Sequence, residues 1–155
     1  MYIREGMNER YSVANTWLAI AAAQGEISSL GTAIEKCGNG MQGFSTPKVE
    51  AWLLQNLKSN SEIEEQLFNF YMGSANCHPV DLDLAERYTS NLKKCSHVYV
   101  PRFIDMRIKE KYHFSNELRQ SLTTNLNFCI QTLLPVDRVG SVEKFQILKK
   151  SLNSQ

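Results

Sequence analysis

The stretch Ala14-Asn-Thr-Trp-Leu-Ala-Ile-Ala-Ala-Ala-Gln-Gly25 predicts a helix that carries one large aromatic residue among small ones. Ala14 and Trp17 are three positions apart, so they share one face of that helix. The pairing of a small or branched residue with an aromatic recurs at intervals of about 35 residues. The three pairs are Ala14 with Trp17, Val49 with Trp52, and Ala85 with Tyr88. Such a period is typical of helical repeats, whose helix pairs must stack on their neighbours to bury their apolar faces.

Helix-capping signals outside these pairs predict an all-α fold. Thr46 before Pro47 suggests an N-cap, Ser61 has capping-box spacing, and Asp81 can cap a helix that runs to about Lys94. Ser115 and Ser141 can open two further helices in the C-terminal third. Val98-Tyr-Val100 reads as a short extended link before Pro101, and we find no hairpin signal between alternating strands. We therefore expect a repeat region over residues 1–98 and a helical extension over residues 99–155 that caps it or docks onto it.

The repeat resembles the Sel-one-like family, a relative of the tetratricopeptide repeat with units of about 36 residues. The family pattern is Ala-x-x-Trp-x-x-x-Ala-Ala-x-x-Gly, followed by a second helix with Leu-Gly and Tyr, a Gly-rich loop and an Asp. The second helices here lack the Leu-Gly pair, and the resemblance covers residues 10–98 only. The matching positions are Ala14, Trp17, Ala21, Ala22, Gly25, Trp52, Tyr71, Asp81, Ala85 and Tyr88.

The resemblance implies a right-handed superhelix of antiparallel helix pairs whose concave face binds protein or peptide, without catalysis. In that arrangement Trp17, Trp52 and Tyr88 belong to the core between helices. The polar column two residues before each aromatic then becomes the candidate partner-binding surface: Asn15, Glu50 and Glu86. A narrower version of this hypothesis is a small bacterial antagonist, such as an immunity protein that neutralises a toxin.

Composition and charge favour no special class of partner. The chain has 155 residues, of which 43% are hydrophobic and 21% charged, and its net charge is +1, so neither nucleic acid nor an anionic membrane is expected as a partner. Residues 1–100 hold 8 basic against 11 acidic side chains, and residues 101–155 hold 9 against 5. The four cysteines are widely spaced, which favours buried free thiols in a reducing compartment and hence a cytoplasmic protein.

Motifs for chemistry are weak. Cys77-His78 and Cys95-x-His97 offer zinc-type ligands, but their spacing fits no common zinc motif, so we expect no metal and no other cofactor. The Gly-x-Gly-x-x-Gly match at residues 38–43 follows a predicted helix and lacks the strand that a phosphate-binding loop requires. The alternative to a binding module is a small helical enzyme or metal-dependent protein that uses Cys77, His78, Asp81 and His97.

Overall fold

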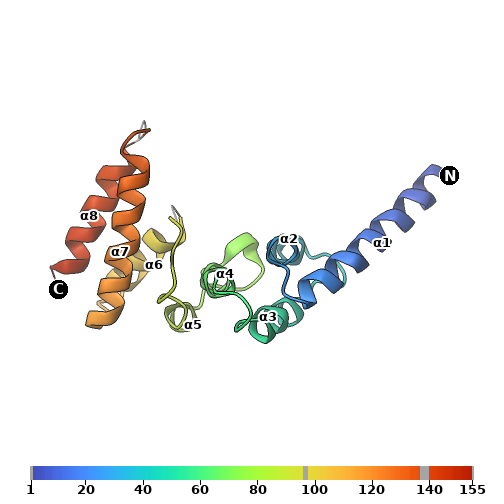
Figure 1. Ribbon diagram of the computed structural model, residues 1–155, viewed down its shortest axis with the longest axis horizontal. Coiled ribbons are helices and arrows are strands. Elements are labelled where there is room, and N and C mark those ends of the chain that lie inside the picture. Colours follow the sequence, from blue (N-terminus) through green and yellow to red (C-terminus); the bar gives the residue numbers. More distant parts are fainter. Residues whose placement is uncertain (1, 96–97, 137–139, 155) are drawn as a thin grey trace. The chain divides into compact units, whose positions relative to one another are not determined.

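The computed structural model describes residues 2–95, 98–136 and 140–154, with side chains from Tyr11 onward, and this part of the chain forms helices and no strand. The all-α prediction is confirmed. The chain divides into two compact units, residues 1–80 and 81–155. Figure 1 shows the helices in chain order: α1 (Tyr2–Ala23), α2 (Ile27–Gly38), α3 (Thr46–Gln55), α4 (Glu62–Tyr71), the 3-10 turn η1 (Ser74–Asn76), α5 (Leu82–Glu86), α6 (Tyr99–Lys109), α7 (Asn116–Leu133) and α8 (Ser141–Asn153).

The first unit contains two helix pairs. Helix α1 packs on α2, α3 packs on α4, and α2 also contacts α3 and α4, so the pairs share one core. Its fully buried members come from all four helices and the loop before α3 and include Ala22, Leu30, Phe44, Val49, Leu53, Leu67 and Phe68. The repeat and its superhelix both stay predictions, because two helix pairs are too few to define either.

Two glycines permit the close approaches within this unit. Gly25 ends α1 with a positive φ of 85°, and a Cβ there would lie 2.7 Å from the side chain of Asn56. Asn56 itself donates through Nδ2 to the carbonyl of Ala23, 3.0 Å away, and so joins α3 to the end of α1. At Gly38 a Cβ would lie 1.7 Å from the carbonyl oxygen of Ala75, so η1 can cover the end of α2 only because this residue has no side chain.

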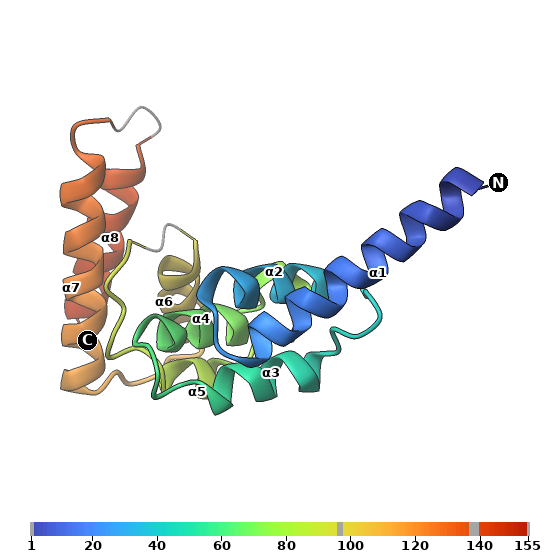
Figure 2. The same cartoon turned by 45° about the vertical axis from the view of Figure 1, so that its right-hand side comes forward.

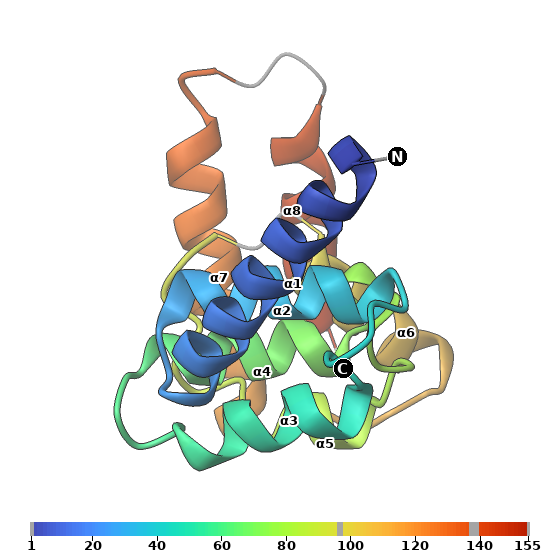
Figure 3. The same ribbon diagram turned by 90° about the vertical axis from the view of Figure 1, so that its right-hand side faces the viewer.

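The second unit is built on α6, α7 and α8. Figure 3 shows α7 and α8 running side by side, and α6 packs against both. The segment that follows α5 has little regular structure, but Asn125 of α7 donates through Nδ2 to the carbonyls of Leu92 and Lys94, each at 2.9 Å. These bonds attach residues 81–95 to the C-terminal helices, so the division falls at Val80 and not at residue 98, the boundary expected from the sequence.

Several local expectations are confirmed and others are wrong. Asp81 caps α5 by accepting from the Leu84 amide at 3.0 Å, and Ser115 caps α7 in the same way through the Leu118 amide. Helix α5 ends at Glu86, well before the expected Lys94. The predicted link at residues 98–100 is the start of α6, where Pro101 lies in the first turn and so interrupts no helical hydrogen bond.

The caps expected for α3 and α4 also differ from the structure. Ser45 occupies the N-cap position of α3, and the Thr46 hydroxyl instead donates to the carbonyl of Cys77 at 2.7 Å. Ser61 makes no cap hydrogen bond, and Asn60 Oδ1 accepts from the amide of Glu62 at 2.9 Å. Thr46 thus bonds to the segment after η1, whereas Asn60 bonds to the first residue of α4 itself.

All four cysteines form disulfides, which corrects the prediction of free thiols. Cys37 is bonded to Cys77 within the first unit, and Cys95 to Cys129 within the second. Each disulfide joins a helix to a segment that contains no long helix. The first holds η1 against α2, and the second holds the end of the 87–95 segment against α7.

We expect reduction to destabilise each unit markedly. The Cys37–Cys77 bond closes a separation of 40 residues, and crosslinks of this span typically contribute about 2–4 kcal/mol by restricting the unfolded chain. The double variant Cys37→Ala/Cys77→Ala should lower the free energy of unfolding by that amount, seen as a lower urea midpoint, and dithiothreitol should lower the midpoint further through Cys95–Cys129. Equal midpoints for the oxidised wild type and the double variant would contradict this expectation.

Glu26 gives the fold a defined acid sensitivity. Its carboxylate accepts from the hydroxyl and amide groups of Ser29 and Ser28 at the start of α2, and these bonds lower the pKa of Glu26 from 4.5 to about 2. A lowered pKa means that the stabilisation is complete above pH 4.5 and is lost between pH 4.5 and 2. The variant Glu26→Gln should unfold at a lower temperature than wild type at pH 7, with the difference disappearing near pH 2. A difference that persisted unchanged at pH 2 would show that the carboxylate charge is not the cause.

Candidate functional site

The three residues of the predicted binding column occupy three different environments. Asn15 is half-buried on α1, Glu50 lies on α3 in the same unit, and Glu86 lies at the end of α5 in the second unit. Glu50 and Glu86 are engaged by neighbouring side chains, as described below. Because internal contacts occupy these two carboxylates, they are poor candidates for partner recognition, and only Asn15 lies in a groove.

Glu50 belongs to a cluster with Tyr71 and His78. The Tyr71 hydroxyl donates to Glu50 Oε2 at 2.8 Å, and His78 Nε2 lies 3.8 Å from the same oxygen. The imidazole ring also contacts the rings of Phe70 and Tyr71, with centroids 5.1 Å apart in each case. These contacts attach the segment after η1 to α3 and α4, so the cluster has a structural role in the first unit.

Glu86 belongs to an ionic cluster around Arg107 of α6. Arg107 is 5% exposed. Its guanidinium donates to Asp83 at 2.7 Å, lies 3.8 Å from Glu86, and stacks 4.1 Å above the ring of Tyr112. Burial lowers the pKa of Arg107, but the hydrogen bond that its guanidinium donates to Asp83 and the charges of Glu86 and Asp83 outweigh burial and raise the pKa. The Tyr112 hydroxyl donates to Glu86 at 2.9 Å, and this bond, with burial, raises the pKa of Tyr112. The cluster joins α5 to α6.

The residues of the alternative catalytic site have other partners. The sulfur of Cys77 is bonded to Cys37 and so cannot act as a thiolate. His78 belongs to the Glu50 cluster, Asp81 caps α5, and His97 lies outside the described residues. Among the described residues, no group of three or more His, Cys, Asp or Glu could hold a metal ion.

The expected repeat core is correct in part for α3, limited to Ala85 on α5, and wrong for Ala14 and Trp17 on α1. Val49 and Ala85 are fully buried, Tyr71 is 2% exposed, and Trp52 packs edge-on against Phe44 with centroids 6.1 Å apart. On α1, Ala22 is buried and Ala21 half-buried, but Ala14 is exposed and Trp17 is 67% exposed. Tyr88 is half-exposed just beyond α5. The pattern of small and aromatic residues does place Ala14 and Trp17 on one face of α1, but no element of the described chain covers that face.

Helix α1 therefore carries an exposed apolar surface. Figure 2 shows its N-terminal half running out beyond α2 and α3. Four of its large apolar side chains lie well in solvent: Tyr11 (68%), Val13 (57%), Trp17 (67%) and Ile20 (44%). Exposed apolar side chains are ordinary when scattered, but several on one short stretch of helix typically mark an interaction surface.

A groove of about 870 Å³ runs along one side of this helix. Its other wall is the segment from Met41 to Phe44 and the first turn of α3. The lining combines apolar side chains with polar groups that can form hydrogen bonds. They include Tyr11, Ser12, Asn15, Thr16, Ile20, Met41, Phe44 and Lys48. Lys48 gives the groove a positive charge, and none of the described residues that line it is acidic.

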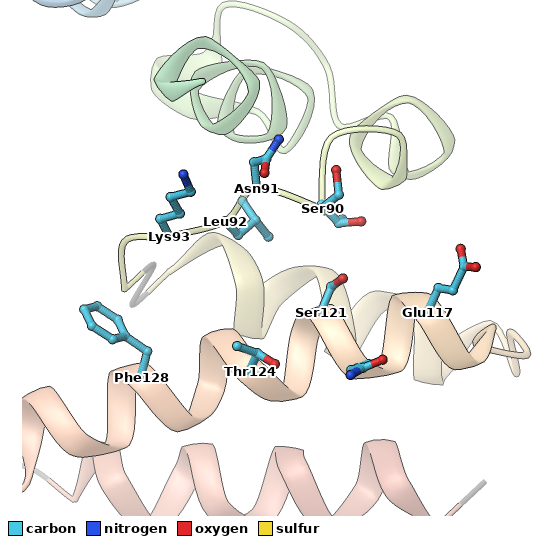
Figure 4. A pocket seen from close by; sticks show the side chains of 10 residues that line it. Ser90, Asn91, Leu92, Lys93, Glu117, Ser121, Thr124 and Phe128 are labelled. Carbon is cyan, nitrogen blue, oxygen red and sulfur yellow. The ribbon is translucent and has the colours of Figure 1, made fainter. Parts of the chain in front are cut away.

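The second unit holds a more polar pocket of about 590 Å³. Figure 4 shows Ser90, Asn91 and Lys93 on the segment after α5 facing Ser121, Thr124 and Phe128 of α7. The Asn125 bonds and the Cys95–Cys129 disulfide hold its two walls together. The lining is mainly hydroxyl and amide groups, and its ionisable side chains are Lys93 and Glu117.

We expect loss of the Arg107 charge to loosen the second unit. The variant Arg107→Met keeps an unbranched stem but removes three ion pairs and the stacking on Tyr112. Asp83 and Glu110 are largely solvated, so they retain water, and the cost is about 2 kcal/mol rather than the larger value of a fully buried pair. Chemical unfolding should show this loss, whereas Arg102→Met, an exposed substitution on the same helix, should change stability by less than about 0.5 kcal/mol. Equal effects of the two substitutions would refute the structural role of the cluster.

No described helix has the length and apolar character needed to cross a membrane. The chain matches no protein-family model, and neither a curated protein nor a solved structure shows significant similarity to it.

Proposed function

We propose that this chain is a non-catalytic protein-interaction module that binds a partner protein or peptide through the groove along α1. The observation that carries the proposal is the concentration of exposed apolar side chains on Tyr11–Ile20 beside a groove of about 870 Å³. Apolar anchors beside polar hydrogen-bonding groups are the usual composition of such surfaces. The binding surface proposed now retains Asn15 and replaces Glu50 and Glu86 with Ile20, Met41 and Lys48.

The chemistry of the groove suggests the form of its ligand. An amphipathic helix can lay apolar side chains over Ile20 and Met41, while Asn15 and Thr16 remain available for hydrogen bonds. An acidic residue at the edge of that helix would pair with Lys48, whose side chain lies at the first turn of α3, where the helix dipole also favours negative charge. The proposed partner therefore presents an apolar segment with an acidic flank.

The resemblance to Sel-one-like repeats remains part of this proposal. The two stacked helix pairs, the buried Val49 and the C-terminal Gly25 of α1 are consistent with it. The exposed Trp17 would then be the open end of a short repeat stack. A bacterial antagonist that neutralises another protein, such as an immunity protein, is the narrower form of the same proposal.

The disulfides bear on where the protein acts. Structural disulfides persist in oxidising compartments and are rare in the cytosol, where thiols are kept reduced. Two such bonds that use every cysteine therefore favour an oxidising compartment over the cytoplasm.

A matched pair of substitutions tests the groove. Met41 and Leu54 are similarly exposed, at 39% and 41%, but only Met41 lines the groove. In an extract of the source cells, wild type and Leu54→Glu should capture the same stoichiometric protein, and Met41→Glu should lose it. Calorimetry with the purified partner should then show at least about a tenfold weaker Kd for Met41→Glu, which corresponds to about 1.4 kcal/mol. Equal binding by both variants would place the site elsewhere, and no stoichiometric partner would count against the binding function itself.

A further inference from the structure

One face of α7 carries a stripe of polar side chains that forms a wall of the pocket of about 590 Å³ in the second unit. At about 100° per residue, positions 117, 120, 121, 124 and 128 fall within about 100° of one another around the helix. On the same helix the Thr132 hydroxyl donates to the carbonyl of Phe128 at 2.8 Å. Within the described chain the hydroxyls of Ser121 and Thr124 make no such bond, so they are available to a ligand in this pocket, which we call the α7 pocket.

The opposite wall of the α7 pocket, residues 89–93, is fixed to the helix. Asn125, which is 1% exposed, donates to the carbonyls of Leu92 and Lys94 at 2.9 Å each. The Cys95–Cys129 disulfide lies one turn further along α7. Because hydrogen bonds and a disulfide already hold this wall, a ligand has little chain to order when it binds.

Two opposite charges lie at the two ends of the α7 pocket. Glu117 is in the first turn of α7, whereas Lys93 lies between the two residues that accept from Asn125, eight residues and about 12 Å further along the helix. Figure 4 shows the same arrangement, with Lys93 toward the Phe128 end and Glu117 at the other. Neither charged side chain has an ion-pair partner among the described residues, so each can pair with a ligand.

We propose that the α7 pocket binds short peptides of four or five residues through their backbone and both termini. Each peptide unit offers one N–H and one C=O, and hydroxyl and amide side chains can accept from the first and donate to the second. Both termini of a free peptide are charged at pH 7, so the ammonium pairs with Glu117 and the carboxylate with Lys93. An extended chain covers about 3.3–3.6 Å per residue, so four or five residues bridge the two charges.

This geometry also sets the specificity of the α7 pocket. Recognition of the backbone tolerates most peptide sequences, but the C-terminal residue lies next to Phe128, which is 46% exposed, and an apolar side chain there is favoured. A single amino acid is too short to reach both charges, and a neutral saccharide has no charge to pair with either. The site lies in the second unit and goes beyond the binding function proposed for the groove along α1.

An NMR titration of the isotope-labelled full chain with alanine oligomers of two to seven residues, at low ionic strength, tests the proposal. The tetramer and pentamer should bind at least about threefold tighter than the dimer, with amide shifts confined to residues 89–95 and 117–128. Acetylating the amine or amidating the carboxylate should each weaken binding roughly threefold, the size expected for one exposed ion pair. Absence of binding at every length, or equal binding of free and doubly blocked peptides, would overturn the proposal. Shifts of the same residues by maltotriose but not by peptides would overturn it in favour of a hydroxyl-rich ligand.

Neutral variants at the two ends test which terminus each charge binds. Glu117→Gln should bind the free pentamer roughly threefold more weakly and no longer respond to acetylation, while Lys93→Gln should no longer respond to amidation. Glu143→Gln and Lys144→Gln make the same charge changes at exposed positions of α8 outside the α7 pocket and should bind as wild type does. Variants at the pocket ends that kept the wild-type response to both blocking groups would contradict the assignment. Met41→Glu should leave peptide binding intact, so this proposal and the groove proposal fail independently.

Discussion

The length of α1 is the constraint on which the rest of the first unit depends. A helix of 22 residues is about 33 Å long, whereas its neighbours α2 and α3, with 12 and 10 residues, measure about 18 and 15 Å. The neighbours cannot cover the whole of α1, so its C-terminal part supplies Ala22 to the core and its middle part remains in solvent. The exposed aromatic face and the groove beside it both follow from this mismatch of lengths.

Disulfides and side-chain bonds stabilise segments of this chain that a continuous apolar core would stabilise in a larger domain. The segments around η1 and residues 87–95 contain few helical hydrogen bonds, and each is attached to a helix by one disulfide and by side-chain bonds to its backbone. The Arg107 cluster does the same for α5, whose five residues are too few to hold a helix by themselves. These attachments explain why Glu50 and Glu86, which look like free surface carboxylates in the sequence, have internal partners.

Local signals predicted the helices well, and they were weaker wherever the outcome depended on distant contacts. The caps at Asp81 and Ser115 are correct because an N-cap needs only the amides of the next turn. Helix α6 was missed because Val98-Tyr-Val100 has extended-chain propensity, although Pro101 three residues into a helix was a usable signal. Asn15 was found by its place in the repeat column, whereas Ile20, Met41 and Lys48 come together only when α1 lies beside the start of α3.

The sequence by itself determined the helical class, most helix positions and the residues that share a face with Trp17, because helix periodicity and capping are properties of neighbouring residues. Only the tertiary structure decided whether that face is covered, which cysteines pair and which carboxylates are engaged. Each of these depends on segments that are far apart in the chain, as Cys37 and Cys77 are, and periodicity carries no information on what lies opposite a helix face. For this reason Trp17 was expected in the core and is instead 67% exposed.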